Sequence, residues 1–304
     1  MKRKVTLFLS ITILSISLLG QMQQEIDSLR IVAPTLPVSQ MVEAYGKLVT
    51  HYSRQAPSVA LTIALEGLEN VQKKNPEKQD QATIYHIVGT AYYFVNDKAS
   101  ALDFLLRSLN LRKELGDLKG TSKTLNNIAI IYLRSERYDE ALAMYEESLS
   151  IKEQLNDTLG IAAAYSNLGN VYLLLKRYDL AAEYTLKSIE IWENTSSKLG
   201  LAQGYNNLAV IHIEQSNFNK ALEYLQKGIK IAENIKHNTD LAEIYSNLGV
   251  VYEKLGYYDK ALQNLQLSLT YLSLTGDLQK KITVYKTISN FYTKIGDYRN
   301  AFEN

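Results

Sequence analysis

Residues 165–188 read YSNLGNVYLLLKRYDLAAEYTLKS, and this stretch decides the fold. Its first half repeats apolar or small residues at offsets of three, four and seven, the spacing of one face of an α-helix. A polar break at 176–179 follows, and a second helical stripe starts at Ala181. The stretch therefore predicts two short helices joined by a tight turn. The residues of the first stripe are Tyr165, Leu168, Gly169 and Tyr172.

The same pattern returns along the chain in steps of forty residues. Such fixed-period self-similarity is typical of arrays in which each repeat packs against its neighbours. One column is aromatic: Tyr85, Tyr165, Tyr205, Tyr245 and Tyr285, with Leu125 in the gap. A second column is small: Gly89, Ala129, Gly169, Ala209, Gly249 and Ser289. A third marks the second helix: Ala101, Ala141, Ala181, Ala221, Ala261 and Ala301.

The small columns predict how the two helices of a repeat meet. Gly169 and Ala181 allow the two backbones to approach closely, and tyrosine rings fill the space around the contact. Turn residues such as Gly116 and Asn156 separate successive repeats. We therefore expect an all-α fold, a right-handed superhelical solenoid of antiparallel helix pairs.

Tyr165-Ser-Asn-Leu-Gly-Asn-Val-Tyr172, followed by a Tyr-x-x-Ala motif, resembles the tetratricopeptide repeat. The period here is forty residues, tyrosine replaces the usual first tryptophan, and the terminal proline is missing. The longer period is similar to that of the Leu-Gly-Asn-type polarity adaptors and the kinesin light chains. The segment from Ser108 to Gly120 is similar to exported tetratricopeptide sensors of Bacteroidetes. In those proteins the array usually precedes a membrane helix and a histidine kinase or DNA-binding domain.

The N-terminus has the pattern of a secretory signal peptide. Lys2, Arg3 and Lys4 precede an apolar run from Val5 to Leu19, which is shorter than a membrane-spanning helix requires. We expect an exported chain on the periplasmic side of a bacterial inner membrane, with an uncleaved anchor as the alternative. The predicted divisions are 1–20 signal peptide, 21–41 leader with at most one helical turn, 42–81 degenerate repeat, 82–281 five repeats and 282–304 truncated repeat.

The composition argues against most catalytic and nucleic-acid functions. The chain has no cysteine, and 33 basic against 32 acidic residues leave a formal charge of +1. A neutral chain has no broad field that attracts polyanions, so we expect no nucleic-acid binding. The four histidines show no metal-ligand spacing, and no nucleophile–base set or phosphate loop appears. We therefore expect neither an enzyme nor a cofactor or metal site.

An asparagine column is the candidate binding site. Its members precede the small column on the first helices, and a carboxamide can pair with both the N–H and the C=O of an extended peptide. We expect this face to be concave and to contribute little to helix packing. The alternative is that these asparagines satisfy polar groups of the neighbouring helix. The candidate residues are Asn126, Asn127, Asn167, Asn170, Asn206, Asn207 and Asn247, with Lys123 and Arg134 as an incomplete basic clamp.

Two functions follow from these observations. The first is a non-enzymatic module that binds a protein or extended peptide, as the sensory or scaffolding part of a longer signalling protein. The second is a structural array that self-associates or bridges a cell-envelope assembly without ligand control. Contact with a membrane is expected only through a further downstream span or an uncleaved signal.

Overall fold

The computed structural model of the chain describes residues 24–275, 278–294, 296–297 and 301. Every regular element in these ranges is a helix, and none is a strand. The predicted all-α fold of consecutive helix pairs is therefore confirmed. The predicted signal peptide, residues 1–20, lies outside the described residues.

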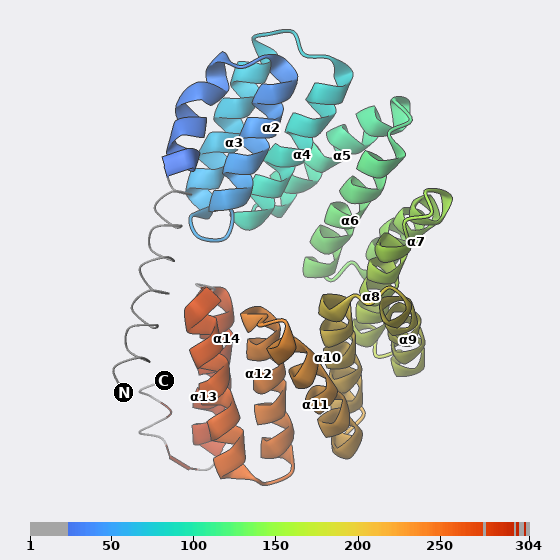
Figure 1. Ribbon diagram of the computed structural model, residues 1–304, viewed down its shortest axis with the longest axis vertical. Helices are drawn as coiled ribbons and strands as arrows, with labels where there is room; N and C mark the ends of the chain where they lie inside the picture. The colour runs from blue at the N-terminus through green and yellow to red at the C-terminus, as the bar shows by residue number, and fades with distance from the viewer. Residues whose placement is uncertain (1–23, 276–277, 295, 298–300, 302–304) are drawn as a thin grey trace, which may run out of the picture. The chain divides into compact units, whose positions relative to one another are not determined.

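The helices follow one another in sequence and are joined by short turns (Figure 1). A helix over residues 24–32 and a 3-10 turn, η1 (Ala33–Thr35), precede them. The bounds are α2 (Val38–Tyr52), α3 (Pro57–Gln72), α4 (Lys78–Phe94), α5 (Lys98–Glu114), α6 (Leu118–Arg134), α7 (Tyr138–Gln154), α8 (Thr158–Leu174), α9 (Tyr178–Asn194), α10 (Lys198–Glu214), α11 (Phe218–Asn234), α12 (Asn238–Lys254), α13 (Tyr258–Thr275) and α14 (Leu278–Lys294).

The chain divides into two compact units, residues 1–127 (unit 1) and 128–304 (unit 2), and the division falls inside α6. In unit 1, α2 packs against α3 and α4 against α5. In unit 2, α8 packs against α9, α10 against α11 and α12 against α13. Turns of about three residues make the two helices of each pair antiparallel neighbours.

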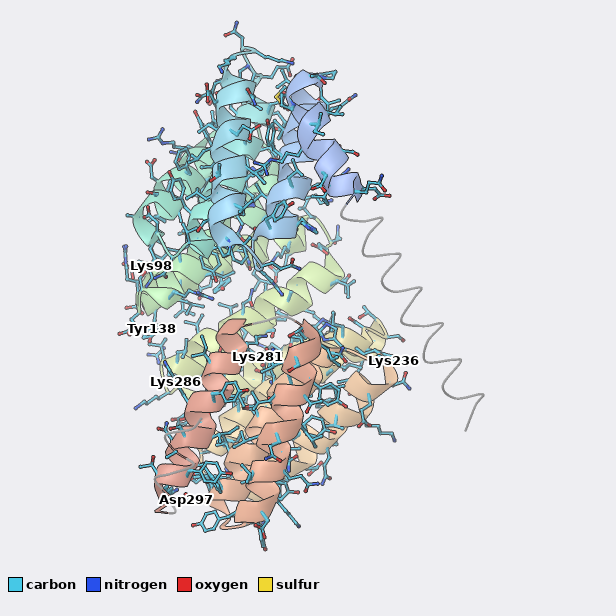
Figure 2. The ribbon with its side chains drawn as sticks, turned by 90° about the vertical axis from the view of Figure 1, so that its left-hand side faces the viewer. Lys98, Tyr138, Lys236, Lys281, Lys286 and Asp297 are labelled. Atoms are coloured by element: carbon cyan, nitrogen blue, oxygen red, sulfur yellow. The ribbon has the colours of Figure 1, made fainter. Side chains whose placement is uncertain are left out.

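From α4 to α13, each turn contains one residue with left-handed backbone geometry, and these residues recur every twenty positions. Lys236, in the turn between α11 and α12 (Figure 2), has a φ of 55°. The following amides then bond back to the last carbonyls of the helix, which satisfies groups that the helix end leaves free. Glycine meets this requirement at Gly116 and Gly256, and polar residues meet it elsewhere. The residues are Asn96, Gly116, Glu136, Asn156, Lys176, Ser196, Ser216, Lys236 and Gly256.

The small column lies where the two helices of a repeat touch. A Cβ atom added at Gly169 would stand 2.7 Å from Thr185 Oγ1 and 3.1 Å from the Ala181 carbonyl oxygen. Contacts this short leave room for a hydrogen atom but not for a side chain. The predicted close approach of the two backbones is therefore confirmed in this repeat.

The tyrosine columns pack between the helices of a repeat. In unit 2, the Tyr184 ring on α9 is stacked on Tyr172 and tilted against Tyr165, with centroid distances of 5.3 and 5.9 Å. These distances are typical of stabilising aromatic pairs. The rings therefore belong to the interface between α8 and α9, as the sequence predicted.

The N-terminal region differs from the sequence prediction. The leader was expected to hold at most one helical turn, but residues 24–32 form a longer helix. Ile26 and Leu29 on this helix pack against the core of unit 1, which includes Met41 and Tyr45. Two apolar residues three positions apart are enough to hold a short helix against an existing core, a signal too weak to stand out in the sequence.

Candidate functional site

The asparagine column lies on the first helices of the repeats, one residue before the buried Leu168 position and its equivalents. Asn127 is on α6, Asn167 on α8, Asn207 on α10 and Asn247 on α12. All four side chains are half-buried, whereas Asn170, one turn further along α8, is exposed. The predicted residues therefore share one helix face but differ in their access to solvent.

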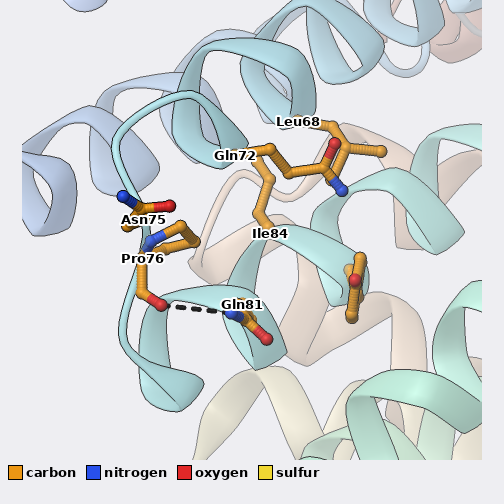
Figure 3. A pocket seen from close by; sticks show the side chains of 7 residues that line it. Leu68, Gln72, Asn75, Pro76, Gln81 and Ile84 are labelled. Carbon is orange, nitrogen blue, oxygen red and sulfur yellow. Dashed lines mark hydrogen bonds between the residues drawn. The ribbon is translucent and has the colours of Figure 1, made fainter.

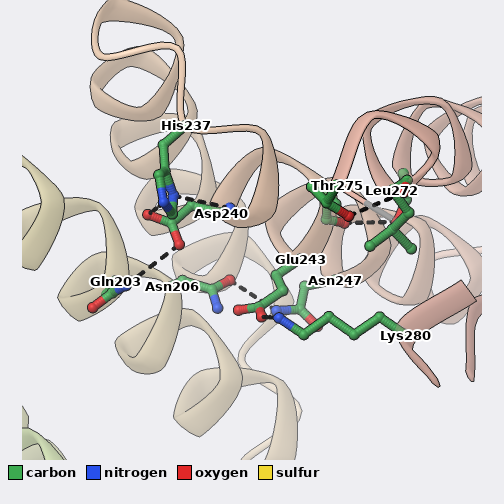
Figure 4. A network of polar contacts seen from close by, with 11 residues as sticks. Gln203, Asn206, His237, Asp240, Glu243, Asn247, Leu272, Thr275 and Lys280 are labelled. Carbon is green, nitrogen blue, oxygen red and sulfur yellow. Dashed lines mark hydrogen bonds and ion pairs between the residues drawn. The ribbon is translucent and has the colours of Figure 1, made fainter. Parts of the chain in front are cut away.

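The column connects each first helix to the first helix before it. In unit 2, the Asn207 Nδ2 group donates to Ser166 Oγ at 3.1 Å, and the Asn247 Nδ2 group donates to Asn206 Oδ1 at 2.8 Å (Figure 4). In unit 1, Asn127 Nδ2 lies 3.3 Å from both Thr90 Oγ1 and His86 Nε2. We call these contacts the asparagine rungs.

The rungs contradict the expectation about helix packing, but they are compatible with the expected role in peptide binding. The expectation that the asparagines contribute little to helix packing is wrong, because their NH₂ groups hold neighbouring helices together. Asn126 and Asn167 also have partners. Within the described residues, however, no hydrogen bond reaches the Oδ1 atom of Asn127, Asn207 or Asn247. Each of these three carboxamides is thus held in place by its donor end and keeps an acceptor.

The rung of unit 1 encloses a neutral histidine. His86 is 6% exposed, and its Nδ1 atom lies 3.1 Å from Thr124 Oγ1, which itself donates to the Gly120 carbonyl. The Nδ1 atom therefore carries the proton, and Nε2 accepts from Asn127. Burial is the main cause that lowers the pKa of His86 to about 3, and the nearby cations Arg112 and Lys123 contribute to this lowering. This imidazole stays uncharged at neutral pH.

The charged side chains near the column have both signs. Lys123 and Arg134, the predicted incomplete clamp, both lie on α6 and are exposed. In unit 2, Glu243 pairs with Lys280, and Glu253 pairs with Lys294 at 2.8 Å. Acidic residues of α12 thus pair with basic residues of α14, and the amide groups of the asparagine column are neutral.

A polar network beside the Asn247 rung was not predicted from the sequence (Figure 4). Asp240 is 4% exposed; its Oδ2 atom lies 3.0 Å from His237 Nδ1, and its Oδ1 atom lies 3.5 Å from Gln203 Nε2. Burial raises the pKa of Asp240, against the lowering effect of His237. The signal was available, because glycine occupies the equivalent positions 120, 160 and 200.

The described residues contain neither a metal-binding cluster nor a membrane-spanning helix. No group of three histidine, cysteine, aspartate or glutamate side chains there could hold a metal ion. Among the same residues, no helix combines the length and apolar character needed to cross a bilayer.

Several solved structures are similar to this chain. The apo form of RapI superimposes with a TM-score of 0.68 at 20% identity, over 86% of this chain and 94% of that one. The apo form of the quorum sensor NprR from B. thuringiensis gives 0.69 at 18% identity, over 93% and 80%. A Rap protein complexed with Competence and Sporulation Factor gives 0.65 at 16% identity, over 91% and 81%. At these identities the likeness concerns the fold.

No curated protein sequence matches the chain. Family models of the tetratricopeptide repeat match residues 101–154, 160–234 and 242–271, which together make up more than half of the sequence. The matched segments contain the α8–α9, α10–α11 and α12–α13 pairs except for a few residues at their ends. The chain belongs to the tetratricopeptide repeat family.

Proposed function

We propose that this chain is a non-enzymatic module that binds an extended peptide segment along the asparagine face of its first helices. The main support for this proposal is the asparagine rungs. Their NH₂ groups are fixed by neighbouring helices, and the Oδ1 atoms of Asn207 and Asn247 remain as acceptors at one position per repeat in unit 2. Acceptors repeated in this way suit the backbone N–H groups of an extended chain.

Two structural relatives support a peptide as the ligand. One is a Rap conjugation gene regulator in complex with the Phr* peptide, and the other is the Rap protein complexed with Competence and Sporulation Factor. The neutral amides of the column and the ion pairs between α12 and α14 favour recognition of a main chain over recognition of a charged end.

We further propose that the module works outside the cytoplasm, as the sensory or scaffolding part of a signalling protein. The basic and apolar N-terminus of the sequence supports export. The alternative is an envelope scaffold that self-associates without ligand control.

A matched pair of variants tests the peptide site. Peptides selected from a random display library on the wild-type chain are measured by calorimetry against Asn207→Ala and Ser166→Ala. Both changes break the same rung, but only Asn207→Ala removes the Oδ1 acceptor. We expect Asn207→Ala to weaken binding by about threefold to tenfold and Ser166→Ala by less than about twofold.

Equal losses in the two variants would show that the rung acts only on the helices and that the peptide site lies elsewhere. If the library yields no peptide and sedimentation shows concentration-dependent assembly, the scaffold alternative replaces the proposal. Glu146→Ala, an exposed position on the second helix α7, serves as the control for nonspecific loss.

A further inference from the structure

Unit 1 contains a pocket at the loop between α3 and α4 (Figure 3). Its volume is about 290 Å³, at the small end of the range for ligand sites. Apolar groups form part of its wall, and the remainder carries amide and hydroxyl groups. The lining residues are Leu68, Gln72, Asn75, Pro76, Gln81, Ile84 and Tyr85.

The loop opens this pocket because it is longer than its equivalents. It runs over five residues, 73–77, whereas three residues separate α5 from α6 and α9 from α10. Asn75 has a φ of 49°, and the Gln81 Nε2 group donates to the Pro76 carbonyl at 3.1 Å (Figure 3). The proline and this hydrogen bond hold the loop away from the end of α3.

Tyr85, which lines the pocket, lacks the partner that other tyrosines of its column have. In unit 2, Tyr205 donates to Glu193 at 3.0 Å and Tyr245 donates to Glu233 at 3.4 Å, each twelve residues earlier. Twelve residues before Tyr85 stands Lys73, which pairs with Glu69. Among the described residues, no hydrogen bond reaches the Tyr85 hydroxyl.

The pocket offers hydrogen bonds but no charge. The side-chain amides of Gln72 and Asn75 make no hydrogen bond within the part of the chain that the structure describes. The nearest cations of the loop are engaged elsewhere, since Lys74 donates to the Leu36 carbonyl and Lys78 pairs with Glu114. An ionised ligand would lose hydration here without gaining an opposite charge.

We propose that this pocket binds a small uncharged ligand with an apolar ring or branched body and one amide group. The ligand body lies against Leu68 and Ile84, and its carbonyl accepts from the Tyr85 hydroxyl. Its amide pairs with the free carboxamides of Gln72 and Asn75, because each of these offers both a donor and an acceptor. The site is separate from the asparagine face, so it adds a second ligand to the proposed function.

Three probes of equal size test the charge requirement: benzamide, benzoate and benzylamine, each titrated into the full chain and followed by NMR. We expect benzamide to bind saturably with a Kd in the millimolar range, as usual for a fragment of this size, and to shift signals of the loop residues. Benzoate and benzylamine should bind at least about tenfold more weakly. Equal binding of benzoate overturns the uncharged class.

Two matched tyrosine variants test whether the ligand binds beside Tyr85. Tyr85→Phe keeps the ring and removes the unpartnered hydroxyl, so we expect benzamide to bind about threefold to tenfold more weakly. Tyr205→Phe, in the same column, should leave benzamide binding unchanged. Unchanged affinity in Tyr85→Phe, or shifts spread over the chain, refutes the proposal.

A third variant separates ligand loss from unfolding. Gln72 is exposed at the end of α3, so Gln72→Leu should not lower the melting temperature, but it removes one amide partner and should weaken benzamide binding by about threefold to tenfold. If Gln72→Leu binds benzamide as wild type does, the pocket is not the site. Asn207→Ala should bind benzamide normally, so failure of this proposal is distinguishable from failure of the peptide face.

Discussion

His86 in unit 1 and Asp240 in unit 2 are both buried titratable groups, yet they respond to acid in opposite directions. Burial disfavours the charged form of each, which lowers the pKa of the base His86 to about 3 and raises the pKa of the acid Asp240. His86 is neutral in the folded chain at pH 7, whereas the surroundings of Asp240 disfavour its charged form. Burial thus lets falling pH destabilise unit 1 and rising pH destabilise unit 2.

The sign for each group follows from linkage. The folded pKa of His86 lies below its unfolded value of 6.5, so its contribution is fully present above pH 6.5 and is lost as pH falls towards about 3. The folded pKa of Asp240 lies above its unfolded value of 3.8, so its contribution is present below that value and is lost as pH rises through the folded pKa. The pH dependence of stability is therefore a property of individual side chains and not of the repeat fold.

The largest expected effect is the acid response of unit 1. Between pH 6.5 and about 3, protonation of His86 in the unfolded chain should reduce the free energy of unfolding by up to about 1.4 kcal/mol per pH unit. Hydrogen exchange of α4 amides across this range measures it, and His86→Gln is the control because it does not titrate. Equal slopes of unfolding free energy against pH in wild type and His86→Gln would falsify the buried neutral state of His86.

The second-largest expected effect is the stability lost when the Asn127 rung or the Asn207 rung is broken. Asn127→Ala leaves the buried His86 Nε2 atom without its donor and should cost about 1–3 kcal/mol. Asn207→Ala leaves the half-buried Ser166 hydroxyl, which can turn to water, and should cost about 0.5–1.5 kcal/mol. Urea unfolding of unit 2 is followed by the fluorescence of Trp192, the single tryptophan of the chain and 6% exposed, and the stability of unit 1 is followed by hydrogen exchange of α4 amides. Equal costs would show that the burial of the rung partner is unimportant.

A smaller effect concerns the buried acid. Asp240→Asn removes a charge that burial disfavours and keeps an acceptor for Gln203, so the stability of unit 2 at pH 7 should rise by about 0.5–1 kcal/mol. Trp192 fluorescence in urea at pH 7 and pH 4 measures the change. The gain should shrink at pH 4, because wild-type Asp240 is protonated more readily there. A loss of stability at both values would mean that the His237 pair outweighs burial.

The smallest expected effect is at the surface pair beside Asp240. Lys280→Ala breaks the pair with Glu243 and should change the stability of unit 2 by less than about 0.5 kcal/mol. It should nevertheless raise the pKa of Asp240, since the charge of Glu243 acts on that carboxyl without its counter-ion. A carboxyl NMR titration measures the shift, and a lowered pKa of Asp240 would contradict the effect assigned to Glu243.

The α8–α9 pair and the asparagine column differ in how much of each could be predicted from the sequence. The α8–α9 pair was predicted from Tyr165, Gly169 and Ala181, because helix spacing and small residues are local signals. The asparagine column was located correctly on the first helices, but its partners were not. Ser166 and Asn206 stand forty-one residues before Asn207 and Asn247, and no local pattern states which side chain of a neighbouring helix lies within hydrogen-bonding distance.

By itself, the sequence determined the helix pairs, their order and their small contact surfaces, since these depend on residue types at fixed short spacings. Only the tertiary structure decided which carboxamide ends remain available, how deeply His86 and Asp240 are buried, and that a five-residue loop opens a pocket beside Tyr85. These properties depend on distances between side chains of different helices. A shift of about 1 Å makes or breaks such a contact, and periodicity along the chain does not encode it.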